Sequence, residues 1–269
     1  MMLLQIVVGV LLAMTVVMVA AWAFGLKTRN GGWTDVFWSF GTGVLLAGAA
    51  FVATGTDTSQ GRRLLIAAFM LVWGLRLGLY LAPRVAGHPE DVRYANFRQQ
   101  FGKRYPVGML FVTLPQALAT GLLALSVVAA AQRPAPGLDI RDALAVLVFL
   151  AAIVGETVAD AQMKRFRSDT ANKGKVIETG LWAWSRHPNY FFQWLGWLAY
   201  PVMALDPSRP VSLLTLVAPA VMYGLLRYVS GVPPLEEAML KSRGDAFRAY
   251  QKRVSVFVPL PPRKEPESV

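Results

Sequence analysis

Residues 64–83 read LLIAAFMLVWGLRLGLYLAP, and this stretch decides the fold class. It is apolar apart from Arg76 and has the length of about 20 residues that a helix needs to cross roughly 30 Å of hydrocarbon. Turn-forming residues separate it from six further apolar blocks of similar length. The seven expected spans are about 3–25, 33–55, 64–83, 107–131, 141–163, 188–205 and 210–230. The sequence therefore predicts an all-α integral membrane bundle of seven transmembrane helices, with residues 1–269 forming a single membrane domain.

Composition supports this class and excludes others. The chain is 55% hydrophobic, whereas soluble domains are usually about 45–50% apolar. It has no cysteine, which excludes disulfides, thiolate metal sites and a cysteine nucleophile. The first block contains Ala21-Trp22-Ala23, which resembles a signal-peptidase site. Because no Lys or Arg precedes this block, we interpret it as the first span and keep cleavage as an alternative.

The formal net charge of +11 comes from basic loops. The loops 26–32, 84–106 and 164–187, together with the tail from Arg227, carry 21 of the 27 Lys and Arg residues, and the loops on the other side carry five. The positive-inside rule then predicts an outer N-terminus and a cytoplasmic C-terminus. It also explains the charge without nucleic-acid binding. We expect a multi-pass protein of the bacterial inner membrane with its active site facing the cytoplasm.

The stretch 235–253 follows Pro233-Pro234 and has a different pattern. Apolar side chains alternate with charges at near-helical spacing, at Leu235, Met239, Leu240 and Phe247. The pattern predicts an amphipathic cytoplasmic helix that lies against the membrane or against the loops.

Polar residues recur at helical spacing near one end of the expected spans. They are Trp33, Asp35 and Trp38 in the second span, Trp73, Arg76, Tyr80 and Arg84 in the third, Gln116 in the fourth, Glu156 and Asp160 in the fifth, and Asn189 and Gln193 in the sixth. An ionisable group costs about 2.5–3.5 kcal/mol at the centre of a span. We therefore expect one polar cavity, open to the cytoplasm, between at least five helices, and almost nothing comparable in the outer half. Singly, each group could snorkel to the interface, and Asp35 with Arg76 could form a structural ion pair.

The mouth of the expected cavity is basic. Its cations are Arg84, Arg93, Arg98, Arg167, Lys173, Lys175 and Arg186. Guanidinium groups match phosphate oxygens, so a phosphorylated small molecule fits. There is no GxGxxG and no Walker loop, so a nucleotide would be held by side chains between helices. The two histidines, His88 and His187, have no ligand partner at metal spacing, and no metal site is predicted.

Several motifs together resemble a known family. They are WTDVFW (33–38), LVWGLRLGLYLAPR (71–84), EDVRY (90–94), GLWAWSRHPNYFFQWLGW (180–197) and LEEAMLKSRGDAFRAYQKRV (235–254). Over almost the whole chain they resemble the bacterial membrane branch of the steroid 5-alpha-reductase superfamily, the 3-oxo-5-alpha-steroid 4-dehydrogenase-like enzymes. The resemblance implies a seven-helix, NADPH-dependent reductase of an enone lipid such as a 3-oxo-4-ene steroid. Isoprenylcysteine carboxyl methyltransferases carry a similar RHPxY element followed by a late acidic helix and a Tyr.

The resemblance also implies roles for individual residues. Asn189 matches an Asn that contacts the cofactor, and Asp160 and Arg167 match an Asp and an Arg of the preceding cofactor segment. Asp35 lies near the substrate-side acid, where eukaryotic relatives have Glu, and Trp73 falls where they have a Tyr that contacts the substrate carbonyl. The expected catalytic residues are Asp35, Trp73, Arg76 and Tyr80. The expected cofactor-binding residues are Arg84, Asp91, Arg93, Tyr94, Glu156, Asp160, Arg167, Trp182, Arg186, His187, Asn189, Tyr190, Gln193 and Glu237.

Conjugate reduction of an enone sets the expected chemistry. A hydride reaches the β carbon, a hydrogen-bond donor or positive field meets the charge on the carbonyl oxygen, and a proton reaches the α carbon. Asp35, if protonated, is the first candidate for the donor and Tyr80 the second, with Arg76 orienting either. NADPH would supply the hydride, with Asn189 and Gln193 offering amides to its nicotinamide end. The hydrophobic, steroid-like substrate would enter a monomeric protein from the lipid.

Two other functions remain open. A methyltransferase that uses S-adenosylmethionine (SAM) would employ the RHPNY element with Glu236, Glu237 and Tyr250. That cofactor has no phosphate, so Arg84 and Arg167 would lack their natural ligand. A transporter or lipid-binding protein would place its polar residues near the midplane, whereas here they gather at one end.

Overall fold

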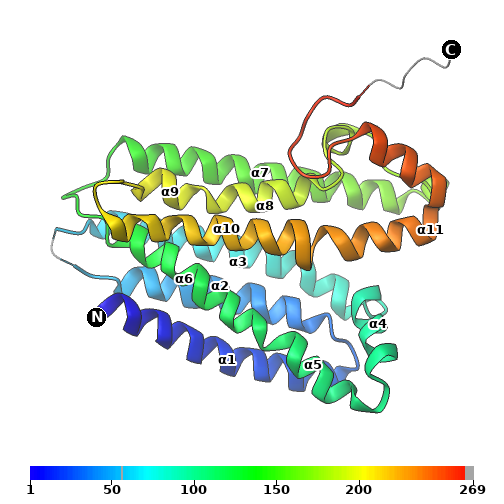
Figure 1. Cartoon of the computed structure of the whole chain (residues 1–269), viewed down its shortest axis with the longest axis horizontal. Coiled ribbons are helices and arrows are strands. Elements are labelled where there is room, and N and C mark those ends of the chain that lie inside the picture. Colours follow the sequence, from blue (N-terminus) through cyan, green and yellow to red (C-terminus); the bar gives the residue numbers. More distant parts are fainter. Residues whose placement is uncertain (56, 264–269) are drawn as a thin grey trace. The chain divides into compact units, whose positions relative to one another are not determined.

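The computed structural model describes residues 1–55 and 57–263, and the described chain is helical without a β-strand (Figure 1). The single-domain prediction over 1–269 extends to Thr56 and to 264–269, which lie outside the described residues. The α-helices are α1 (Met2–Thr28), α2 (Trp33–Val52), α3 (Gln60–Ala86), α4 (Val92–Phe101), α5 (Tyr105–Thr113), α6 (Pro115–Ala131), α7 (Ile140–Ser168), α8 (Pro188–Trp197), α9 (Ala199–Ala204), α10 (Val217–Gly224) and α11 (Val232–Arg253). Four 3-10 segments (Gly102–Arg104, Thr170–Asn172, Gly180–Ala183, Pro210–Leu216) and a π-helix (Leu225–Val229) complete the chain.

Six helical segments of the described chain are long and apolar enough to cross a membrane. They are Met2–Thr28, Trp33–Val52, Gln60–Ala86, Arg93–Ala131, Ile140–Ser168 and Pro210–Arg253. The predicted span 188–205 is divided into α8 and α9, which are each shorter than 18 residues. The helices also present apolar side chains outward, as Leu4, Leu12 and Val16 of α1 do with 63–70% of their surface exposed. Long apolar helices with apolar outer faces fit a multi-pass membrane protein.

Contacts divide the chain into two compact units. The first unit contains Met1–Ala145 and Tyr200–Val221, and the second contains Val146–Ala199 and the chain from Met222 onward. Helices α1, α2, α3 and α6 pack side by side in the first unit. The second unit contains most of α7, α8 and α11.

Glycines bring α2 and α3 of the first unit into close contact. A Cβ on Gly43 would lie 2.9 Å from Cα of Gly74, and one on Gly74 would lie 2.7 Å from Cα of Gly43. Small residues at such crossings let two membrane helices approach and gain packing contacts. Gly32 of the same pair lies beside Val85, so α2 and α3 are antiparallel, and Asp35 and Arg84 lie at the same end of the pair.

The opposite end of this pair contains a buried polar cluster that the sequence did not predict. Arg62, near the start of α3, has no exposed surface and donates from Nε and Nη2 to both oxygens of Asp142, at 2.7 and 2.8 Å. It also donates to the carbonyl oxygens of Arg133 and Gly137 at 3.0 and 2.9 Å. The expectation that this half holds almost nothing polar was therefore wrong. Arg62 was counted as a loop cation, but its guanidinium folds inward and ties α3 to the start of α7.

The apolar face of α11 packs on a loop of the second unit. Phe247, Tyr250 and Val254 form a buried cluster with Val176, Met239 and Leu240. Of the two surfaces considered for this stretch, the structure therefore favours the loops over the membrane. The helix is kinked at Gly244, which has a φ of 52°, a conformation that glycine adopts at little cost.

Candidate functional site

In the first unit, Asp35 is the centre of a partly exposed polar cluster. Its Oδ2 accepts a hydrogen bond from Nη2 of Arg93 at 2.8 Å, and its Oδ1 accepts one from the hydroxyl of Tyr94 at 2.9 Å. The Arg93 and Asp35 side chains are 31% and 25% exposed. The charged groups are therefore accessible at the end of an apolar helix, although they form a pair.

In this arrangement both oxygens of Asp35 accept hydrogen bonds, one from Arg93 and one from Tyr94. A carboxylate accepts hydrogen bonds and cannot donate one. Of the two candidate donors to a substrate carbonyl, the geometry therefore favours Tyr80 over Asp35. Both oxygens of Asp35 are engaged by residues of α4.

Helix α4 brings Arg93 and Tyr94 to Asp35 because its start is fixed. Asp91 is the N-cap residue and accepts from the backbone N–H of Arg93 at 2.9 Å and from its Nε at 3.0 Å. Such a cap satisfies a backbone donor that the first helical turn leaves open. Burial opposes ionisation of Asp91, but the nearby Arg93 outweighs it, and the net effect lowers the pKa of this carboxyl. Asp91, predicted as a cofactor contact, thus orients Arg93 here.

Glu90 was not predicted, yet it joins three parts of the first unit. It accepts from the backbone N–H of Gly31 at 2.7 Å, from Nε and Nη2 of Arg98 at 3.0 Å each, and from the hydroxyl of Tyr105 at 3.3 Å. Burial acts to raise the pKa of Glu90, but the bond from Arg98 and the other donors outweigh it, so the pKa is lowered. The EDVRY motif contains Glu90, but a loop has no helical spacing that could have assigned it a partner.

The predicted stripe on α3 is present as a set of ring contacts. The guanidinium carbon of Arg76 lies 5.5 Å from the ring centroid of Tyr80, and that of Arg84 lies 5.0 Å from it. Trp73 is buried and meets Trp38 edge to face, with centroids 5.6 Å apart. The ring of Tyr80 is thus flanked by two cations.

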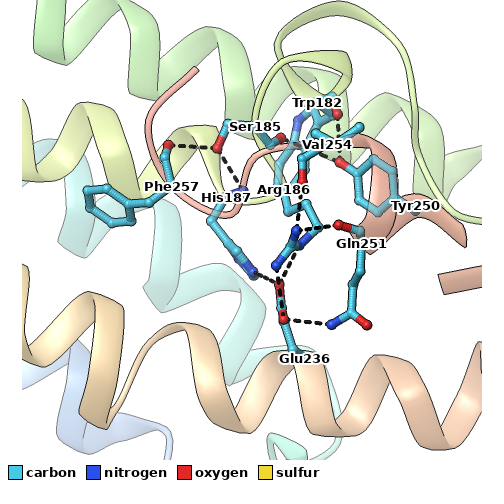
Figure 2. A network of polar contacts seen from close by, with 9 residues as sticks. All are labelled: Trp182, Ser185, Arg186, His187, Glu236, Tyr250, Gln251, Val254 and Phe257. Carbon is cyan, nitrogen blue, oxygen red and sulfur yellow. Dashed lines mark hydrogen bonds and ion pairs between the residues drawn. The ribbon is translucent and has the colours of Figure 1, made fainter. Parts of the chain in front are cut away.

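In the second unit, the SRHPNY element is bound to α11 through Glu236 (Figure 2). Arg186 donates from Nε and Nη2 to the two oxygens of Glu236 at 2.7 and 3.4 Å. Its Nη1 donates to the carbonyl oxygens of Gln251 and Val254, and Gln251 donates to Glu236 at 2.8 Å. The guanidinium of Arg186 is therefore largely committed to this network.

The neighbours of Arg186 complete the same network (Figure 2). The hydroxyl of fully buried Ser185 donates to the carbonyl of Phe257 at 2.8 Å and accepts from the backbone N–H of His187 at 3.1 Å. Tyr250 donates its hydroxyl to the carbonyl of Trp182 at 2.6 Å. These bonds hold the loop before α8 against the C-terminal segment.

His187 is neutral in this setting. Burial lowers its pKa, and the bond to Glu236 opposes this without cancelling it. Its Nε2 lies 3.1 Å from Oε1 of Glu236, so this nitrogen carries the proton and Nδ1 keeps a lone pair. The imidazole stacks on the ring of Tyr190, with centroids 5.6 Å apart and an interplanar angle of 9°.

Asn189 lies at the start of α8 and donates from Nδ2 to Oδ1 of Asp160 on α7 at 3.2 Å. Glu156, one turn earlier on α7, and Gln193 on α8 are also buried. The resemblance implied that Asp160 and Asn189 come from two successive cofactor segments, and the structure brings the two side chains together.

Other predicted cofactor contacts of the second unit lie elsewhere. Glu237 is 67% exposed and forms an i,i+4 ion pair with Lys241, so Glu236 and not Glu237 faces the SRHPNY element. Trp182 donates its indole N–H to the carbonyl of Ala159 at 3.0 Å, which anchors its loop to α7. Arg167 is exposed near the end of α7. A polar groove beside it is lined by Gln162, Arg165, Phe166, Ser168, Asp169, Asn172, Ile177, Thr179 and Gly180.

Comparisons with known proteins place the chain in a family. It belongs to the family described as "Protein of unknown function (DUF1295)", which matches residues 21–254. It is also similar to the uncharacterized protein C594.04c of Schizosaccharomyces pombe, with 27% identity over 280 residues that cover 94% of this chain and 79% of the yeast protein. No solved structure matches the chain significantly.

Proposed function

We propose that this protein is a membrane-embedded oxidoreductase that uses NADPH to reduce the carbon–carbon double bond of an enone lipid, such as a 3-oxo-4-ene steroid. The observation that carries the proposal is the accessible Asp35–Arg93–Tyr94 cluster at the end of α2 and α3 where Tyr80 is flanked by Arg76 and Arg84. Charged groups inside apolar helices are costly and generally functional when they are accessible.

Residues of the first unit would act on the carbonyl of the substrate. As hydride reaches the β carbon, the electrons of the double bond move toward the carbonyl oxygen and make it an enolate. In this proposal the hydroxyl of Tyr80 donates a hydrogen bond to that oxygen, and the guanidinium groups of Arg76 and Arg84 stabilise its negative charge. A proton from water completes the reduction at the α carbon. Asp35 accepts hydrogen bonds from Arg93 and Tyr94 and holds both in place.

Residues of the second unit would hold the cofactor, which supplies a hydride when bound. The donor set fits a nicotinamide, because Asn189 places a carboxamide beside the buried carboxylate of Asp160 and Gln193 carries a second, buried carboxamide one turn further along α8. Exposed cations close to the end of α7, among them Arg167, Lys173 and Lys175, suit phosphate oxygens. Arg186 is less suited to that role because Glu236 and two carbonyls take its donors.

The topology belongs to the same proposal. The pair α8 and α9 would form a seventh crossing together, with the N-terminus outside and the C-terminal helix in the cytoplasm of a bacterium. The excess of Lys and Arg in alternate loops supports this orientation. The active site would then face the cytoplasm, where NADPH is found.

A binding experiment tests the assignment of the cofactor. The purified full-length protein in detergent should quench or shift the fluorescence of NADPH with a Kd in the micromolar range or below, and Asn189→Ala should weaken this binding about tenfold. Asp245→Asn, a change at an exposed position of α11, should bind NADPH like the wild type. A protein that binds SAM and ignores NADPH would contradict the proposal.

One observation favours the methyltransferase as a second candidate. That function would employ the RHPNY element with a late Glu and Tyr, and the structure joins Arg186 and His187 to Glu236 and places Tyr250 in the same network. Transfer of a labelled methyl group from SAM to an isoprenylated cysteine peptide, abolished by Glu236→Gln, would establish this alternative. The accessible cations of the first unit have no role in it, and we therefore place it second.

A further inference from the structure

Glu90 contacts the turn between α1 and α2, the helix α4 and the start of α5, all within the first unit. Its side chain is only 13% exposed, and its Oε1 and Oε2 accept from Gly31, Arg98 and Tyr105. Arg98 in turn lies over the ring of Tyr105, with its guanidinium carbon 4.0 Å from the centroid. One carboxylate thus contacts three segments, and Arg98 adds hydrogen bonds to the carbonyl oxygen of Arg29 at 3.3 Å and to the hydroxyl of Tyr105 at 3.2 Å.

Gly31 connects this carboxylate to the Asp35 cluster. Its backbone N–H donates to Glu90, and its Cα lies against the ring of Tyr94, where a Cβ would come within 2.7 Å of Cδ1. The same ring carries the hydroxyl that donates to Asp35 at 2.9 Å. The contact between Glu90 and Gly31 therefore sets how closely α4 approaches the start of α2.

The short distance along the chain makes this coupling direct. Glu90 precedes the N-cap Asp91, and Arg93 and Tyr94 lie in the first turn of α4. If Glu90 releases Gly31, the helix can move away and carry both partners of Asp35 with it. Asn30 fixes the same turn to the end of α3, because its Nδ2 donates to the carbonyl of Val85 at 3.0 Å.

We propose that Glu90 is a positioning residue, which clamps α4 onto Gly31 so that Arg93 and Tyr94 reach Asp35. The charge of Glu90 matters because Arg98 and the Gly31 N–H both donate to it, and hydrogen bonds to a charged group are stronger than neutral ones. The role in turnover rests on the proposed reductase activity, whereas the clamp itself does not.

Hydrogen–deuterium exchange of the full-length protein in detergent tests the clamp. In Glu90→Gln we expect the amides of residues 29–35 and 91–98 to exchange about tenfold faster than in the wild type. The amides of α6 should be unchanged, and Asp245→Asn, which also removes one negative charge, should change neither region. Arg98→Gln should reproduce the pattern, because it removes the same ion pair from the other side. Unchanged exchange in 29–35, or equal acceleration throughout the first unit, would overturn the proposal.

Kinetics separates positioning from a general loss of stability. Glu90→Gln should lower the rate of NADPH-dependent enone reduction about tenfold in the wild type and leave it nearly unchanged in a Tyr94→Phe background, because residues that act through one another are not additive. Equal losses in both backgrounds would contradict action through Tyr94. If the wild type reduces no enone, the proposed function fails, and the exchange result alone then decides whether the clamp exists.

Discussion

The two ends of the first unit each contain an Arg–Asp pair, and the pairs differ in access to solvent. Arg62 and Asp142 are 0% and 2% exposed, and the remaining donors of Arg62 are satisfied by backbone carbonyls. Arg93 and Asp35 are 31% and 25% exposed, and Arg93 comes from the short helix α4. A sealed, saturated pair can only connect elements, whereas an accessible pair can meet a ligand. The comparison therefore gives one end a structural role and leaves the other end open to a ligand.

The largest expected effect is a loss of stability when the buried Arg62–Asp142 pair is broken. Arg62→Met should lower the free energy of unfolding by about 3–5 kcal/mol, because it leaves the buried carboxylate of Asp142 without its partner. Thermal unfolding in detergent would measure the loss. The double variant Arg62→Met/Asp142→Leu should recover much of it, because a buried pair replaced by apolar residues leaves no charge unpaired. A double variant less stable than the single one would show that the pair itself is strongly stabilising.

At the accessible pair the expected effect is on turnover. Asp35→Asn should reduce enone reduction about a hundredfold, because Arg93 and Tyr94 lose the carboxylate that orients them. Its unfolding free energy should change by only about 1 kcal/mol, as for other exposed ion pairs. Equal losses of stability in Asp35→Asn and Arg62→Met would remove the distinction between the two ends.

The sequence predicted residues of the accessible end better than those of the buried end, for a physical reason. Tyr80 and Arg84 lie on a helix, so their spacing showed that they share a face. Arg62 lies three residues after the N-cap of α3, where hydropathy cannot tell a cation that faces water from one that folds inward. Glu90 lies in a loop, and its three partners come from segments whose approach depends on tertiary packing.

The same reasoning explains two details of the helices. The block 188–205 is largely apolar, yet the chain divides there into α8 and α9, because a helix end depends on local backbone contacts that hydropathy does not contain. Glu236 and Glu237 are adjacent and chemically equal, and only the path of α11 determines that Glu236 faces Arg186 while Glu237 faces Lys241.

Tyr80→Phe should sharpen the assignment within the accessible end. Removing the hydroxyl takes away one hydrogen bond to the developing enolate, so the turnover number should fall about tenfold to a hundredfold. The KM for the enone should change little, because the ring and both flanking guanidinium groups remain. A stopped-flow assay of NADPH oxidation would separate the two parameters. If the turnover number were unchanged, another hydroxyl would have to donate the hydrogen bond to the enolate oxygen.

The clamp should respond to acid in a predictable direction. The pKa of Glu90 is lowered from its usual 4.5 in the folded state, so its stabilising effect is complete above about pH 4.5 and is lost as the pH falls below that value, where the opened form takes up a proton first. The protection factors of the amides in residues 29–35 should therefore fall as the pH is lowered from about 5 to about 3. Glu90→Gln should show low protection at both values. If the protection factors of Glu90→Gln fell with pH as much as those of the wild type, the loss of protection would come from another carboxyl.

The smallest expected effect is at a fully exposed pair. Asp245 is 97% exposed and forms an i,i+3 pair with Arg248 on α11. Because water screens such pairs, Asp245→Asn should change neither the melting temperature nor turnover measurably. A clear loss of turnover in this variant would show that α11 takes part in the reaction.

One measurement tests the central claim most directly, namely that the accessible end of the first unit serves an NADPH-dependent reductase. The purified protein in lipid nanodiscs would be incubated with NADPH and a panel of 3-oxo-4-ene steroids and simpler enones. The masses of the products would be measured by mass spectrometry. We predict oxidation of NADPH matched by a product two hydrogens heavier than one of the enones, with the rate nearly abolished in Asp35→Asn and retained in Asp245→Asn. Turnover that is the same in Asp35→Asn as in the wild type, or methyl transfer from SAM without any oxidation of NADPH, would contradict the account.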